Sequence, residues 1–296
     1  MDKTLCKQFD TLRNYLPDDL KNHGSVDFNQ NENIKYYCPN VSSGNTKECK
    51  NELDKIKAGC LWLFEQLFVN NQKNINNVQY IILWLSYKLN QKTYDEIKDL
   101  NDFYNKYIEN NTHYTSCNND RGDCSKQLQG NTGYKNYREI IDGRKKLLST
   151  NIGNMSKFYD AFKPLCNMYS ELNENNTISD KSIENANKFV EKYNELNPSD
   201  IDEESPYYQV LSTLSNDYNN FKNYCDASVD CNKIPSLTQT KTEESGMQSS
   251  EESCDDTSSF SIVKKLILAL LIFSAISIFL GIFFKVNNKK FKNYFH

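Results

Sequence analysis

The sequence is poor in the residues and motifs on which catalysis depends. Only three histidines occur among 296 residues, and no C-x-x-C pair is present, so a zinc site has little support. The glycine-rich loops that hold nucleotide phosphates, G-x-x-x-x-G-K-[ST] and G-x-G-x-x-G, are missing, as are H-E-x-x-H and G-x-S-x-G. His23 and His113 lie in polar stretches without an orienting partner nearby in the sequence. We therefore expect no enzyme, no cofactor and no bound metal.

A basic excess is also missing from the N-terminal part of the chain. The six lysines after position 261 are accompanied by no acid, so residues 1–261 carry 29 basic and 39 acidic side chains, a net charge of −10. Binding to a phosphate backbone needs a basic face. Nucleic acid is therefore not expected as a partner.

Strand-like alternation of apolar and polar residues is nowhere long enough to predict a sheet. Apolar residues instead recur every three or four positions, and they predict helices over residues 4–16, 48–68, 77–89, 93–108, 133–148, 152–172, 180–196 and 205–225. We expect an all-α, cysteine-rich domain of about seven or eight helices over residues 1–234. The polar loops 23–45 and 113–130 are the places where variation and contact cost the fold least.

One stretch lacks charge altogether. Residues 266–284 read LILALLIFSAISIFLGIFF, and a helix of this length spans about 28 Å, close to the hydrocarbon thickness of a bilayer. We expect a transmembrane helix over residues 262–284, with the lipid bilayer as a partner. Residues 235–261 are rich in Ser, Thr and Glu, which predicts a flexible stalk between the helical domain and the membrane.

Lysines flank the apolar stretch unequally. Two precede it and four come after it: Lys264, Lys265, Lys285, Lys289, Lys290 and Lys292. This excess favours a short cytosolic tail over residues 285–296 and an N-terminal domain outside. The first twenty residues lack the apolar core of a cleavable signal peptide. A tail-anchored protein with its large domain inside the cell, acting as a tether or scaffold, is therefore the alternative.

Ten cysteines are present, and a disulfide framework in an oxidising compartment is favoured over ordinary buried thiols. Short spacings suit small closed loops for Cys117 with Cys124 and for Cys225 with Cys231. Cys254 lies on the predicted stalk, without a core to cover it, and is a candidate for pairing two chains into a homo-oligomer. The candidates for structural disulfides are Cys6, Cys38, Cys49, Cys60, Cys117, Cys124, Cys166, Cys225 and Cys231.

Two kinds of short motif are weak signals. Arg121-Gly122-Asp123 lies between Cys117 and Cys124 and resembles an integrin ligand, although a match of three residues arises readily by chance. N-x-[ST] sequences occur at Asn40, Asn110, Asn154 and Asn175. Asparagine is so abundant in this chain that we infer no glycosylation from them.

Several stretches in order carry a family resemblance. They are the N-terminal helix with Cys6, then GCLWLFEQLF, YIILWLSYKLN and SKFYDAFKPLCNMY, the Ser/Thr/Glu-rich stalk, the apolar stretch and the tail KVNNKKFKNYFH. In this order they resemble the Plasmodium interspersed repeat (PIR) family of malaria parasites, in a member from a rodent-infecting species. The resemblance covers essentially the whole chain.

The resemblance implies a variant surface antigen of a multigene family. Such a protein has a helical, cysteine-rich ectodomain and one C-terminal span, lacks a classical signal peptide, and is exported toward the infected red-cell surface. It implies a host surface protein of unknown identity as partner, and it favours Cys6, Cys49, Cys60 and Cys166 as disulfide residues. The chain departs from the family in its short tail and lacks an Arg-x-Leu-x-acidic export signal. The alternative then becomes a tether or scaffold on a parasite-derived membrane.

Overall fold

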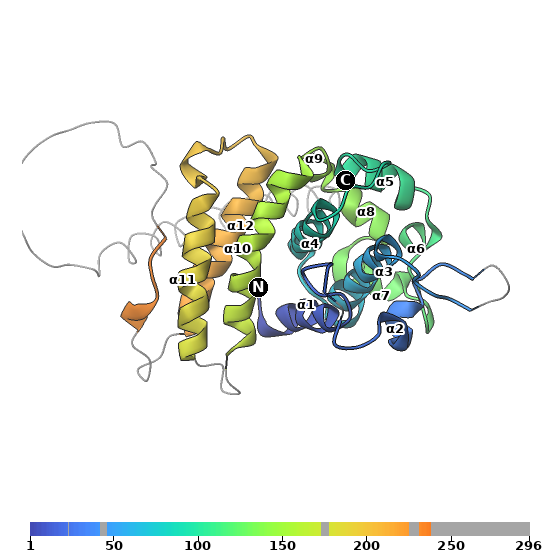
Figure 1. Ribbon diagram of the computed structural model, residues 1–296, viewed down its shortest axis with the longest axis horizontal. Helices are drawn as coiled ribbons and strands as arrows, with labels where there is room; N and C mark the ends of the chain where they lie inside the picture. The colour runs from blue at the N-terminus through green and yellow to red at the C-terminus, as the bar shows by residue number, and fades with distance from the viewer. Residues whose placement is uncertain (23, 42–45, 173–177, 225–230, 238–296) are drawn as a thin grey trace, which may run out of the picture. The chain divides into compact units, whose positions relative to one another are not determined.

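The computed structural model of the protein describes residues 1–22, 24–41, 46–172, 178–224 and 231–237 (Figure 1). Within these residues, no helix is both long and apolar enough to span a membrane. The predicted transmembrane helix, its flanking lysines, the tail, Cys254 and most of the predicted stalk lie outside the described residues.

Three helices from the first third of the chain build one part of the core. Helix α1 (Lys3–Tyr15) begins at Asp2, whose carboxylate accepts the Leu5 N–H at 2.9 Å. Helix α3 (Glu52–Phe64) begins at Asn51 and continues without a break into the π-helix η2 (Glu65–Asn70). Helix α4 (Val78–Asn90) is buried on nearly every side, as expected of a segment that is apolar all round.

Helix α10 (Ile152–Ser170) is the centre of the domain and packs against α1, α4, α11 and α12. Helices α11 (Asp180–Glu195) and α12 (Pro206–Phe221) lie beside it in a three-helix layer (Figure 1). Ser179 begins α11 with a capping box, and Ser205 followed by Pro206 begins α12. A serine N-cap and a proline in the first turn are both typical of a helix start.

Short elements connect these long helices. The helices are α2 (Glu32–Lys35), α5 (Leu100–Tyr107), α6 (Thr112–Thr115), α7 (Ser125–Thr132), α8 (Tyr137–Asp142) and α9 (Lys145–Leu148). Single 3₁₀ turns are η1 (Phe28–Gln30), η3 (Ile75–Asn77), η4 (Pro198–Asp200), η5 (Lys222–Tyr224) and η6 (Cys231–Lys233). Strands β1 (Asn118–Asn119) and β2 (Gly122–Asp123) form a small antiparallel hairpin.

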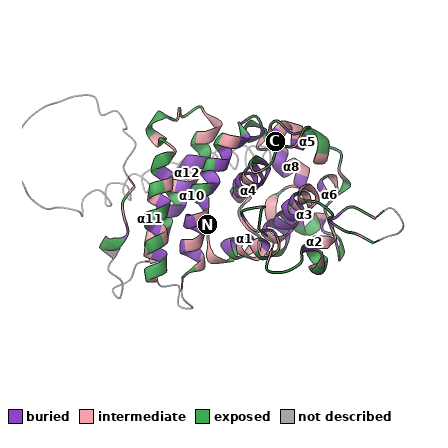
Figure 2. Cartoon of the chain, in the orientation of Figure 1, coloured by how far each residue is buried: buried purple, intermediate pink, exposed green. Residues whose placement is uncertain are grey.

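The prediction of a helical domain is confirmed, with eight helices of eight residues or more among the described residues. The buried faces of the long helices meet in one aromatic-rich core (Figure 2). Phe162 is stacked on Tyr80 with ring centroids 4.6 Å apart and meets Phe9 edge-on at 5.0 Å. The single ring of Phe162 therefore joins α10 to both α1 and α4.

Three disulfides cross-link the described residues. Cys6–Cys166 joins α1 to α10, whereas Cys38–Cys49 and Cys117–Cys124 close short loops. The structure differs from the prediction at Cys60, which is a buried free thiol beside the Tyr114 hydroxyl. Burial raises the pKa of the Cys60 thiol to about 12. Cys225 and the Cys231 side chain lie outside the described residues.

The structure also differs from the prediction at the start of the helix that contains Cys60. The predicted helix over residues 48–68 placed Cys49 and Cys60 on one face, but α3 begins only at Glu52. Cys49 therefore lies in the segment before the helix and pairs with Cys38 instead of pointing along the Cys60 face. Helical spacing predicted that Cys60 is buried, which is what the structure has, but burial does not require a partner.

Candidate contact surface

The two polar loops that the sequence predicts separately lie against each other. Tyr36 and Tyr37 from the first loop pack edge-on against His113 from the second, with ring centroids 5.4 and 5.3 Å apart. Each loop is closed by its own disulfide, Cys38–Cys49 or Cys117–Cys124. We call the described residues of 24–49 together with residues 113–124 the two-loop surface.

A short ladder holds the arms of the first loop, which reach away from the helices in Figure 1. Asn40 and Lys47 form an antiparallel bridge. Next to it, the Val41 N–H donates to the Thr46 carbonyl at 2.8 Å. The disulfide at the base and the ladder above it together fix where the arms leave the fold.

The second loop is built as a hairpin. Asn118 pairs with Asp123 and Asn119 with Gly122, so that Asp120 and Arg121 form the turn. Gly122 has φ +108°, a conformation that costs glycine little and other residues much. The predicted polar loop therefore has a defined backbone shape at its tip.

A buried glutamate joins the two loops from below. Glu65, the first residue of η2, is only 3% exposed. Its two carboxylate oxygens accept hydrogen bonds from the Tyr37 hydroxyl and the Asn119 amide, both at 3.0 Å. Burial raises the pKa of Glu65, and the hydrogen bond from Tyr37 opposes that shift. One carboxylate thus positions both halves of the two-loop surface.

We expect Glu65→Ala to lower the free energy of unfolding by about 2–3 kcal/mol, because it leaves the buried Tyr37 hydroxyl and Asn119 amide without their acceptor. Amide hydrogen exchange over residues 117–124 should accelerate more than exchange in α11, a helix that packs on α10. Equal acceleration in both places would mean that Glu65 supports the fold generally and does not position the hairpin.

The raised pKa of Glu65 also predicts how the stability of the fold changes with pH. Above about pH 4.5 the folded chain holds a proton on Glu65 that the unfolded chain releases, so this group makes the free energy of unfolding fall as pH rises. Glu65→Gln keeps the shape and removes the titration. Wild type should therefore lose stability relative to Glu65→Gln between acidic and neutral pH, which urea unfolding at both pH values measures.

A hollow of about 400 Å³ lies between the outer parts of the two loops. It is lined by Glu32, Lys35, Tyr36, Thr46, Lys47 and Asp120. The Lys47 amine lies 4.3 Å from the centre of the Tyr36 ring and donates to the Tyr36 carbonyl. Burial lowers the pKa of Lys47, and burial together with the Lys47 charge lowers the pKa of His113. The hollow carries both charge signs and suits polar contact with a protein surface.

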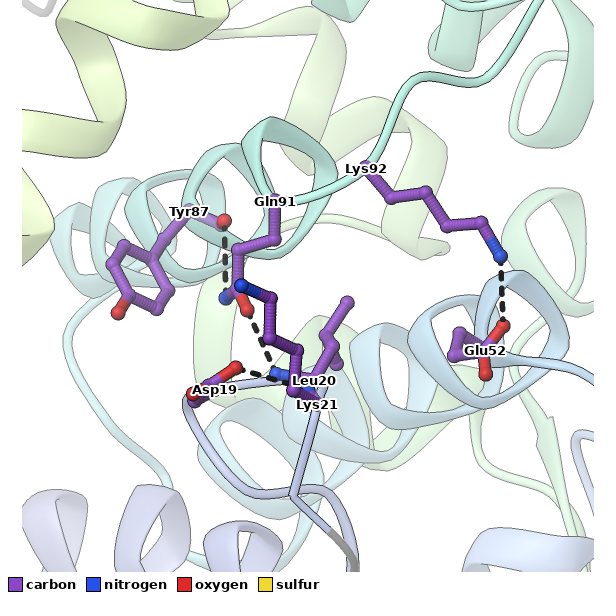
Figure 3. Close-up of a pocket in the computed structure, with 7 residues that line it drawn as sticks. All are labelled: Asp19, Leu20, Lys21, Glu52, Tyr87, Gln91 and Lys92. Atoms are coloured by element: carbon purple, nitrogen blue, oxygen red, sulfur yellow. Dashed lines mark hydrogen bonds and ion pairs between the residues drawn. The ribbon is translucent and has the colours of Figure 1, made fainter.

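A second hollow of about 580 Å³ lies near the end of α4 (Figure 3). Its lining residues are Asp19, Leu20, Lys21, Glu52, Tyr87, Gln91 and Lys92. Gln91 accepts the Leu20 N–H at 2.8 Å, and Lys92 pairs with Glu52 at 3.3 Å. Several of its polar groups thus bind each other, and the hollow offers no arrangement of a base and a nucleophile.

Large hydrophobic side chains are rarely exposed on the described surface. Val26 and Tyr208 are the only large hydrophobic side chains exposed in the described part of the chain, at 37% and 36%. No group of three or more His, Cys, Asp or Glu side chains within it could hold a metal ion. A partner of this surface would therefore be bound mainly by polar and aromatic contacts.

The structure shows where the weaker motifs lie. Arg121, Gly122 and Asp123 are all exposed on the hairpin. Asn40, Asn110 and Asn154 are exposed too, whereas Asn175 lies outside the described residues. Sequence reasoning missed Glu65, although the single acid within the apolar run GCLWLFEQLF was a signal that could have found it. Nothing in the sequence pointed to Tyr37 and Asn119 as its partners.

A helical domain tied by disulfides is typical of proteins that face an oxidising compartment, and polar loops closed at their base are typical places for recognition. Residues 6–285 match the family model described as Plasmodium variant antigen protein Cir/Yir/Bir, and the chain belongs to this family. That description agrees with a member from a rodent-infecting species. It is a family of variant antigens and not of enzymes.

A solved structure agrees with the family match. The chain is similar to a Plasmodium PIR protein ectodomain, with 31% sequence identity and a TM-score of 0.55, over 80% of this chain and 99% of that one. No curated protein matches the chain significantly. The resemblance to PIR proteins that the sequence carries is thereby confirmed.

Proposed function

We propose that this chain is a single-pass membrane variant antigen that displays its helical domain outside a malaria-infected cell, for contact with host molecules or for immune evasion. The family and the similarity to a PIR ectodomain support the display of the N-terminal domain. The uncharged stretch 266–284 and the lysine excess after it support a membrane anchor with a cytosolic tail.

The observation that carries the proposal is the construction of the two-loop surface. Two disulfides and the buried Glu65 hold the loops from beneath. Residues on the outside of the loops, such as 25–27 and 120–123, are exposed. Exposed substitutions away from such supports usually change stability by no more than about 0.5 kcal/mol. Sequence can therefore change on the outside of the loops while the shape that presents it persists, as antigenic variation requires.

Protease treatment of intact infected cells tests the display. We expect an epitope placed before Ser236 to be removed while the cells stay sealed, because the proposed topology puts the domain outside. Cells opened with detergent serve as the positive control, and a cytosolic parasite protein reports leakage. Protection of the epitope until the membrane is opened would refute surface display and favour a tether on an internal parasite-derived membrane.

A further inference from the structure

The tip of the hairpin presents two opposite charges in a fixed frame. The Arg121 side chain is 73% exposed, and its only described ion pair is a long one of 3.9 Å to its neighbour Asp120. Asp123 is exposed on β2, two residues away. The Cys117–Cys124 disulfide closes the loop just outside these residues, and the Cys124 N–H donates to the Cys117 carbonyl at 2.8 Å.

Two residues of the tripeptide have local structural roles, which the third lacks. Gly122 supplies the positive φ of the turn. One oxygen of Asp123 accepts the Ser125 N–H at 2.8 Å, at the start of α7. Hydrogen bonds from Ser125 lower the pKa of Asp123, so its carboxylate is charged at neutral pH. The Arg121 side chain, in contrast, is mostly exposed, and the ion pair described for it is the long one to Asp120.

The Asp123 carboxylate can accept further bonds besides those from Ser125. An ionised carboxylate has about four acceptor positions, and the hydrogen bonds from Ser125 leave others open while limiting the side chain's freedom. Carboxylate oxygens are preferred ligands of Mg²⁺ and Ca²⁺. A guanidinium pairs with a carboxylate through two parallel hydrogen bonds. The tip therefore offers one group for a cation and another for an acid.

We propose that this hairpin is a ligand for an adhesion receptor that itself holds a divalent cation. The Asp123 carboxylate would complete the coordination of the receptor's cation, and the Arg121 guanidinium would pair with a receptor carboxylate. The inference rests on the proposed function, because it needs the domain to face host surfaces. It goes beyond that function by assigning the contacting residues and the chemistry of the partner.

The cation is assigned to the partner because the described residues of this chain do not provide a metal site. No group of three or more suitable side chains gathers anywhere among them. A single exposed carboxylate binds a divalent ion usefully only when a partner supplies the remaining ligands. The disulfide and the strand pairing reduce the entropy that a flexible tripeptide would lose on binding, which favours affinity.

The test uses the purified full-length chain in detergent and recombinant integrin ectodomains that bind linear Arg-Gly-Asp peptides. We expect saturable binding in Mn²⁺ that EDTA abolishes. Asp123→Asn should weaken binding by about tenfold or more, because the amide can still accept the Ser125 N–H but lacks the charge that the cation needs. Arg121→Lys should weaken binding as well, since an ammonium lacks the paired donors.

Glu203→Gln is the control, because it removes an exposed acid outside the two-loop surface and should leave binding unchanged. Binding that survives EDTA, or that is equal in wild type and Asp123→Asn, would overturn the proposal. So would no binding by wild type to ectodomains that capture the linear peptide. Binding by the purified chain does not depend on membrane topology. Failure to bind the receptor would therefore overturn this proposal alone, whereas protection of the domain in intact cells would overturn surface display alone.

Discussion

Replacing Cys6 and Cys166 together by alanine is expected to lower the free energy of unfolding by about 5 kcal/mol, a large part of the stability of a typical domain. The two cysteines are 160 residues apart, and their bond joins α1 to α10. A cross-link restricts the unfolded chain more when it closes a longer loop. This disulfide therefore restrains most of the domain at once.

The Cys38→Ala/Cys49→Ala variant is the matched control. Its bond spans only 11 residues, and the same chain-entropy relation gives a loss of about 3 kcal/mol. Urea unfolding of the detergent-solubilised chain, followed by circular dichroism, measures both losses. A loss for the Cys6–Cys166 pair no larger than that of the control would show that the unfolded chain is already restricted by other structure, and that α1 docks on α10 without help.

The long helices were predictable because their apolar period and their capping residues agree. The predicted ranges 4–16, 77–89 and 180–196 differ by at most one residue at each end from α1, α4 and α11. Each of these helices buries one apolar stripe or is buried all round, so the burial pattern and the helical period predict the same helix.

The range 93–108 failed as a single helix for a local reason. Asp99 accepts the Asp102 N–H at 2.8 Å and starts α5 afresh at Leu100. The residues before it turn back in a bridge between Tyr94 and Ile97. The spacing of apolar residues does not reveal a capping side chain such as that of Asp99, at which a new helix starts.

The contact surface was predictable as two polar loops but not as one site. Composition identified both loops, because polar residues rarely build a core. Their meeting depends on Glu65, Tyr37 and Asn119, which come from three separate segments. Disulfide pairing is limited in the same way: spacing predicted the Cys117–Cys124 loop, whereas the Cys6–Cys166 bond requires knowing that α1 packs on α10.

Replacing Lys88, like breaking the Cys6–Cys166 disulfide, should lower the free energy of unfolding substantially. It lies on α4 and is 0% exposed. Its amine donates to the carbonyls of Leu16 and Asp18 at 3.3 and 3.1 Å, and also to the carbonyl of Pro17. These carbonyls lie just after the end of α1, so one side chain holds the chain where it leaves that helix.

The environment of Lys88 sets its protonation. Burial lowers the pKa of Lys88 to about 7, although the neighbouring Asp18 carboxylate favours the charged amine. Asp18 gives limited help because it already pairs with Arg13 at 3.1 Å and with Lys163 at 2.7 Å. Above about pH 7 the folded chain therefore binds fewer protons at Lys88 than the unfolded chain, whose lysine stays charged to about pH 10. The free energy of unfolding should rise with pH across this window.

Lys88→Met is expected to lower the free energy of unfolding by about 3 kcal/mol near pH 9, since the neutral amine donates two N–H bonds and each buried carbonyl left without its donor costs about 1.5 kcal/mol. Near pH 7 the loss should shrink to about 1 kcal/mol, because wild type then bears the cost of a buried charge that methionine avoids. Lys92→Met, at a lysine whose side chain is 59% exposed, is the control and should change little at either pH. Urea unfolding of the three chains at both pH values distinguishes the outcomes. A loss that stays constant or diminishes toward high pH would show that Lys88 remains charged in the fold, and that its ammonium stabilises the end of α1 as an ion.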